Sequence, residues 1–217
     1  MDRDQLIARH PRLYHIADAR NWDSILACGL LSTSSLLDRF EVGGASRDAL
    51  ESGHRPRTEA IPPAGPHPAH GLAFVRDQRP LQPGPLAGCL EGMTVEQWLR
   101  LLNGRVFFWP TTERRDGMLR AYRKSEQAVF EVDARGLLER HGDRVELCHI
   151  NSGYASSAYP PARRGRDSFL PIERYKDAAS NRIAEVTVPG SVPDIFEVTI
   201  RVATWLEGKE VGTLWEP

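Results

Sequence analysis

Two spacings of hydrophobic residues occur along the chain, and they predict where its helices and strands lie. Apolar residues at every second position are typical of strands, and apolar residues three or four apart are typical of helices. The first spacing predicts strands over 12–17, 72–75, 105–109, 127–133 and 144–150, and two more within 182–204. The second predicts helices over 2–10, 22–28, 32–40, 45–52, 93–103, 112–124 and 134–142. Because helices come early, strands cluster later and regular strand–helix alternation is missing, the pattern predicts an α+β fold.

Residues with special backbone roles mark the ends of some predicted helices. Asp18 or Asn21 is suited to cap the second helix, and Gly29 is suited to end it with a positive φ. Thr94 and Gln97 have the spacing of a capping box, which marks the start of the helix over 93–103.

Two strand segments carry further expectations. The alternation over 127–133 predicts a strand with one face toward water. The segment 182–204 is predicted to form two strands around a Pro-Gly turn. In the first of them, Glu185 and Thr187 share one face.

The stretch 53–72 is rich in proline, glycine and histidine and is predicted to be a long irregular loop. Neither flank is a complete domain, so residues 1–217 are expected to form a single domain. His67 and His70 lie three positions apart in this loop, but a metal site would need more ligands nearby, which favours a solvated loop.

Composition excludes several classes of protein. The 217 residues are 41% hydrophobic with a net charge of −1, which is typical of a globular protein and gives no overall sign of nucleic-acid binding. Three distant cysteines, Cys28, Cys89 and Cys148, favour free thiols, and we expect a cytoplasmic protein. The charged N-terminus and the lack of a long apolar run predict neither a signal peptide nor a membrane span.

The sequence has no GxGxxG motif after a strand, no GxxxxGK(S/T) motif for nucleotide binding and no GxSxG motif of hydrolases. Candidate chemistry therefore rests on single residues. His15 lies in an apolar strand, where a histidine is more often a core residue than a ligand contact. Glu185 lies between Ala184 and Val186. It is either on the wet face of an ordinary strand or on the wall of a ligand cleft.

Arginines and aromatic residues form the other candidates. Arg76, Arg114 and Arg115 each follow an apolar strand, where a guanidinium could reach a pyrophosphate or remain a solvated surface charge. In the strand over 105–109, Phe107 and Trp109 point to one side and Phe108 to the other. One of these faces could stack on a planar ring.

Taken in order, these residues resemble the DarT-like branch of the ADP-ribosyltransferases, and more closely an uncharacterised bacterial family of that fold. The resemblance rests on Tyr14-His15-Ile16-Ala17, Asn21-Trp22, Gly29-Leu30, Val106 to Trp109, Arg114, Met118-Leu119, Glu185 and Val188-Pro189. Ala17 stands where the DarT pattern has threonine. Arg76 is the first candidate for the counterpart of that pattern's essential arginine, and Arg114 is the second.

The resemblance implies split mixed or antiparallel sheets, with short N-terminal helices, around a cleft for NAD as substrate. It implies an NAD-dependent ADP-ribosyltransferase, in the glycosyltransferase class, with Glu185 and Arg76 as catalytic residues. The implied NAD-binding residues are His15, Asn21, Gly29, Leu30, Phe108, Trp109, Arg114 and Met118; no metal is expected. His15 would bind the adenosine ribose, Arg76 the diphosphate, and Phe108 or Trp109 the nicotinamide.

The resemblance also implies a nucleic-acid base as acceptor, DNA before RNA, with a role as a toxin or in phage defence and an antitoxin as partner. The segments 113–124 and 162–167 are basic and add limited physical support. Two alternatives stay open: an enzyme like the NAD-dependent RNA 2′-phosphotransferases, and an inactive binding module on the same fold, which Ala17 favours.

Overall fold

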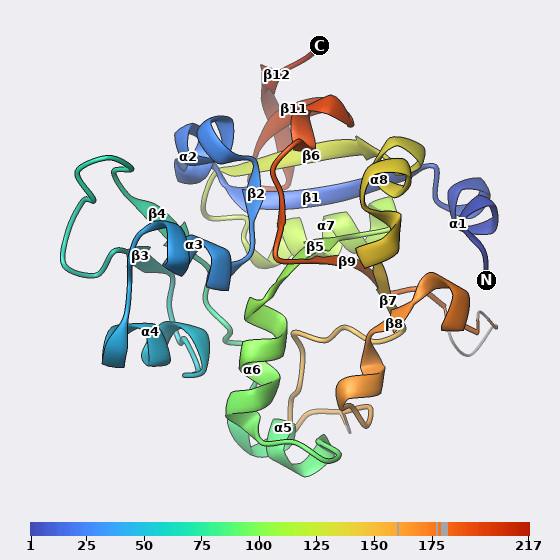
Figure 1. The fold of residues 1–217 in the computed structure, drawn as a ribbon, viewed down its shortest axis with the longest axis horizontal. Coiled ribbons are helices and arrows are strands. Elements are labelled where there is room, and N and C mark those ends of the chain that lie inside the picture. Colours follow the sequence, from blue (N-terminus) through green and yellow to red (C-terminus); the bar gives the residue numbers. More distant parts are fainter. Residues whose placement is uncertain (160, 177, 179–181) are drawn as a thin grey trace.

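The computed structural model describes residues 1–159, 161–176, 178 and 182–217, and it confirms the α+β class. Two four-stranded antiparallel sheets form the centre of the molecule (Figure 1). The first sheet has the order β1 (Arg12–Asp18), β6 (Gln127–Asp133), β11 (Thr199–Leu206) and β12 (Lys209–Trp215). The second has the order β5 (Arg105–Phe108), β9 (Glu185–Pro189), β7 (Glu146–Cys148) and β8 (Leu170–Pro171).

The two sheets meet where the edge strand β1 of the first lies beside the end of β5 in the second. Tyr14 donates its N–H to the carbonyl of Trp109 at 2.9 Å, and Trp109 donates back to Tyr14 at 2.8 Å. The main hydrophobic core joins residues of both sheets, among them Leu13, Phe130 and Val186, all fully buried. This junction therefore fixes the end of β5 against β1.

The predicted helices are present. They are α1 (Arg3–Arg9), α2 (Trp22–Cys28), α3 (Thr33–Arg39), α4 (Gly44–Glu51), α6 (Val95–Asn103), α7 (Thr112–Ala121) and α8 (Ala134–His141). The capping box of α6 is confirmed: the Thr94 side chain accepts from the Gln97 N–H and the Gln97 side chain accepts from the Thr94 N–H. Asp18 caps a 3₁₀ turn over Ala19–Asn21 rather than α2, and Asn21 is at the start of α2 without a side-chain cap bond.

Helix α5 (Pro83–Cys89) was not predicted. Further 3₁₀ turns lie at Gly142–Arg144, Arg166–Ser168, Ile172–Arg174 and Ile195–Glu197. The stretch 53–72 is not wholly irregular, because β3 (Glu59–Ile61) lies within it and pairs with β4 (Ala73–Val75). His67 and His70 stack at 4.7 Å between ring centroids, and no metal-binding cluster is found among the described residues.

The strand predictions were wrong in one respect. The strand over 127–133 has no wet face, because β6 is the middle strand between β1 and β11 and is buried along most of its length. Strands lie on both sides of the Pro-Gly turn, as predicted, and they belong to different sheets: after β9 the chain enters β10 (Ser191–Val192), which pairs with β2 (Leu30–Leu31). Only then does it reach β11.

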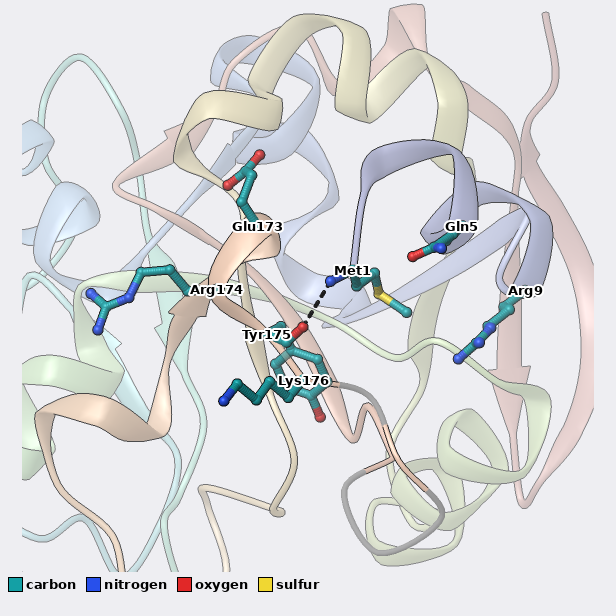
Figure 2. A pocket seen from close by; sticks show the side chains of 7 residues that line it. All are labelled: Met1, Gln5, Arg9, Glu173, Arg174, Tyr175 and Lys176. Atoms are coloured by element: carbon teal, nitrogen blue, oxygen red, sulfur yellow. Dashed lines mark hydrogen bonds between the residues drawn. The ribbon is translucent and has the colours of Figure 1, made fainter.

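The N-terminus lies against a distant part of the chain. The ammonium group of Met1 donates to the carbonyl of Tyr175 at 2.9 Å, beside a surface pocket of about 740 Å³ (Figure 2). Gln5, Arg9 and Lys176 also line this pocket. Over the described residues, no helix has both the length and the apolar character that crossing a bilayer requires.

Candidate functional site

A second cavity, of about 1000 Å³, brings together most of the residues singled out in the sequence. It lies where β1, β4, β5, α7 and the first residue of β9 come together, at the junction of the two sheets. Its lining includes His15, Asn21, Arg76, Trp109, Arg114, Met118 and Glu185. Such a volume suits a cofactor-sized ligand.

Glu185 is the first residue of β9 and lies opposite Cys148 of the neighbouring strand. The residue is only 5% exposed, so it does not lie on a wet face. Its Oε1 accepts a hydrogen bond from the Ser152 N–H at 3.0 Å, whereas Oε2 has no hydrogen-bond partner among the described residues. A buried carboxylate oxygen without a partner is costly unless a ligand or water supplies one.

Burial raises the pKa of Glu185 to about 7. Hydrogen bonding from Ser152 and the positive charges of Arg114 and Arg164 act in the opposite direction and favour the carboxylate. The group therefore exchanges its proton near neutral pH, which suits acid–base chemistry.

His15 lies in the middle of β1, opposite Phe130. Its Nδ1 is 2.9 Å from the carbonyl oxygen of Phe107, and because a carbonyl only accepts, Nδ1 carries the proton. Burial lowers the pKa of His15 to about 4, so the ring is neutral at pH 7 and Nε2 is an acceptor. An acceptor at this position suits a ligand hydroxyl.

Arg76 directly follows β4. Its guanidinium lies over the ring of Tyr122, with Cζ 4.5 Å from the centroid, and its Nη2 donates to Oε1 of Gln127. Nη1 is buried and has no partner within the described part of the chain. Burial lowers the pKa of Arg76, and the nearby Asp18 and Asp77 counteract this effect. The cavity thus holds a cation with a spare donor.

Asn21 lines the cavity but uses its amide for structure. Its Nδ2 donates to the Phe74 carbonyl at 2.9 Å and its Oδ1 accepts from the Phe74 N–H at 2.7 Å. Both bonds fix the strand that leads into Arg76. The side-chain amide of Asn21, which the resemblance assigns to NAD binding, is therefore already hydrogen-bonded to the backbone of Phe74.

Three of the expected NAD-binding residues do not line the cavity: Gly29, Leu30 and Phe108. Leu30 and Phe108 are buried in the main core, and Phe107 lines the cavity in place of Phe108. Gly29 has φ +70°, and a Cβ there would lie 2.4 Å from the Pro193 carbonyl oxygen. Its role is close packing of α2 against the β10 segment.

Trp109, Arg114 and Met118 form one wall from the end of β5 to α7. Trp109 and Met118 also pack against Leu119 in a small hydrophobic cluster. Arg114 lies in the first turn of α7, where its N–H donates to the Thr111 hydroxyl at 3.4 Å. Arg114 and Met118 belong to the helix that the sequence predicted over 112–124.

Several cavity residues were not predicted, including Asp18 as a site residue, Arg55, Tyr122 and Ser152. Asp18 is buried and accepts from Arg20 Nη2 at 2.7 Å, beside the cavity. Two signals in the sequence could have found further cavity residues. One is the charged run "VRDQR" over 75–79, and the other is Tyr122 at the end of α7. The pairing of Ser152 with Glu185 left no local signal, because it depends on how the sheets bring distant segments together.

Fold and site together define an α+β protein whose two sheets enclose a cavity lined by charged and aromatic side chains. The chain belongs to a family of unknown function (DUF7002), whose profile matches residues 11–199. That range contains every cavity residue and leaves out α1 and most of the β11–β12 hairpin. No match was found among the curated proteins.

Proposed function

We propose that this chain is an NAD-dependent ADP-ribosyltransferase in which Glu185 is the catalytic carboxylate. The observation that carries the proposal is the buried Glu185 carboxyl, with Oε2 unpartnered among the described residues, on the wall of a cavity of about 1000 Å³. The same cavity holds the spare Arg76 donor and the neutral His15 ring. The cavity therefore offers Arg76 as a donor for an anion of the ligand, His15 as an acceptor for a hydroxyl, and Glu185 as a carboxylate for a developing positive charge.

The chemistry needs one carboxylate. The bond between the ribose C1′ and the nicotinamide nitrogen breaks, and nicotinamide leaves as a neutral molecule with both bonding electrons. No acid is needed for this departure, unlike the usual glycosidase, and the sugar passes through an oxocarbenium-like state. Ionised Glu185 would bind a ribose hydroxyl, stabilise the positive charge and take the proton that the acceptor loses when it attacks C1′.

The other cavity residues would hold NAD in place. Arg76 would donate from Nη1 to the diphosphate, and Nε2 of His15 would accept from the adenosine ribose. Of the two aromatic residues that the resemblance offered for stacking on nicotinamide, Trp109 lines the cavity. We therefore assign that role to Trp109.

For the acceptor we propose a nucleic-acid base, with DNA before RNA. Exposed cations support a path for a phosphate backbone: Arg120 in the last turn of α7, Arg123 and Lys124 after it, and Arg163 and Arg166 in the loop over 162–167. Arg164 of the same loop is buried and cannot contribute. In line with the resemblance, we also propose a toxin or phage-defence role with an antitoxin partner.

The test is incubation of the protein with NAD labelled on the adenylate, together with DNA, RNA or protein. We expect label on DNA and release of nicotinamide, and a loss of about 10²–10³-fold in rate for Glu185→Gln. Glu173→Gln, which removes an exposed carboxylate outside the cavity, is the matched control and keeps full activity. Nicotinamide release unchanged in Glu185→Gln would refute the mechanism.

The inactive binding module is the second candidate, because Ala17, which lines the cavity, has a methyl group where the DarT pattern has a hydroxyl. It predicts a rise in melting temperature with NAD but no nicotinamide release. An enzyme like the RNA 2′-phosphotransferases would instead move the 2′-phosphate of an RNA end onto the ADP-ribose part of NAD, and it would not need Glu185.

A further inference from the structure

Glu185 accepts a hydrogen bond from a turn that a buried arginine, Arg164, also contacts. The turn covers Asn151 to Tyr154 and is closed by the Tyr154 N–H, which donates to the Asn151 carbonyl at 3.2 Å. Within it, the Ser152 N–H donates to Oε1 of Glu185 at 3.0 Å. The direction of this N–H sets where the carboxylate lies.

Arg164 fixes the carbonyl groups of that turn. Its Nη1 donates to the Ser152 carbonyl at 3.2 Å and to the Tyr154 carbonyl at 2.9 Å, and its Nε donates to the Ala162 carbonyl at 3.0 Å. The residue is only 3% exposed, and its guanidinium lies 5.8 Å from the ring centroid of Trp98 in α6. A planar fork reaching three carbonyls is a geometry that lysine cannot copy.

The backbone of Arg164 is anchored as well. Its N–H donates to the Cys89 carbonyl at 3.0 Å, and its carbonyl accepts from the Glu91 N–H at 2.9 Å. A Cβ at the next residue, Gly165, would lie 2.7 Å from the Glu91 carbonyl oxygen, so the two backbones approach closely. The backbone of Arg164 is therefore fixed by the segment 89–91, and its guanidinium is fixed by the turn.

We propose that Arg164 is a positioning residue for Glu185, acting through the Ser152 N–H. Only the catalytic part of this inference rests on the proposed function. The effect of Arg164 on the position of the Glu185 carboxylate does not depend on which ligand binds. Arg164 also lies close enough to favour the ionised carboxylate by its charge. It thus contributes orientation and charge without touching the substrate.

The test follows the Ser152 amide by ¹H–¹⁵N NMR while pH is varied, with the Glu185 carboxyl followed by ¹³C. In the wild-type chain we expect the Ser152 amide proton to shift as Glu185 loses its proton, with a midpoint at the Glu185 pKa of about 7. In Arg164→Met we expect this shift to be lost and the Glu185 midpoint to move upward. Arg163→Met is the matched control, because the Arg163 side chain is 81% exposed and pairs with Glu91 on the surface.

Arg164→Lys separates orientation from charge, and it also serves if Arg164→Met does not fold. Lysine keeps the charge but not the fork, so we expect the Ser152 shift to weaken while the Glu185 midpoint stays near its wild-type value. A Ser152 amide that titrates in both variants as in the wild type would overturn the inference.

Activity gives an independent measurement. If NAD is turned over, kcat should fall by about 10²-fold in Arg164→Met through misplacement of Glu185, with KM little changed. If NAD is not turned over by any form of the protein, the proposed function fails, and the NMR result still decides the role of Arg164.

Discussion

At the residue scale, the surroundings of Glu185 matter more than its chemical type. Glu146 and Glu185 are both strand glutamates of the second sheet. Glu146 pairs with Arg105 at 2.5 Å, so its charge is neutralised within the protein. Glu185 has a hydrogen bond to one oxygen and a raised pKa, and it faces a cavity. This contrast makes Glu185 the better candidate for chemistry.

Gly29 offers a stability test at the same scale. Gly29→Ala combines a positive φ of 70° with a Cβ placed 2.4 Å from the Pro193 carbonyl oxygen. We expect a loss of at least about 2 kcal/mol in the free energy of unfolding, measured by urea denaturation. The control is Gly208→Ala, which has φ +77° but open space around its Cβ and should cost about 1 kcal/mol. Equal losses would contradict a packing role for Gly29.

The sequence alone was enough to select His15 and Glu185 as candidate site residues, but it did not reveal the residues that contact Glu185. His15 and Glu185 could be picked out because a polar side chain interrupts an apolar strand. Whether Glu185 faced water or a cavity depended on which strands flank β9, and no local pattern contains that information. Ser152 and Arg164 lie in an irregular loop, so their contacts with the site had no periodicity to reveal them.

At the element scale, the start of α6 can be tested directly. The Thr94 side chain accepts from the Gln97 N–H at 3.3 Å, and this bond satisfies a donor that the helix itself cannot pair. Thr94→Ala should therefore lower the free energy of unfolding by about 1 kcal/mol in urea denaturation. Thr112→Ala, at the exposed first residue of α7, is the control and should change it by less than about 0.5 kcal/mol. A Thr94→Ala chain as stable as this control would exclude a contribution from the cap.

Elements with local signals were predicted well, and elements that depend on distant partners were not. Capping residues and helical spacing lie within a few positions of each other, so α6 and α7 could be read from the sequence. The assignment of β9 and β11 to different sheets depends on pairings with β5, β7 and β6, far away in sequence. Helix α5 has no helical spacing of apolar residues, because two prolines and two glycines occupy its seven positions, although proline at the first helical position is a start signal.

At the scale of the whole molecule, Glu185 and His15 give opposite dependences of stability on pH. Glu185 has a pKa raised from 4.5 to about 7, so between these values the folded state holds a proton that the unfolded state has lost. Its contribution is present at low pH and is lost as pH rises to 7. His15 has a pKa lowered from 6.5 to about 4, so its contribution is present above pH 6.5 and is lost as pH falls to 4.

These opposite trends overlap between pH 4.5 and 6.5 and partly cancel in the wild-type chain, so single variants should separate them. Urea unfolding at pH values from 4 to 8 measures each difference from wild type. We expect Glu185→Gln to gain stability over wild type as pH rises to 7, by on the order of 3 kcal/mol. His15→Gln should lose stability relative to wild type over the rise from pH 4 to 6.5. The exposed Glu173→Gln variant gives the baseline for removing a surface carboxylate. If either difference ran in the opposite direction, the buried environment assigned to that group would be wrong, because an exposed histidine or carboxylate produces no such trend.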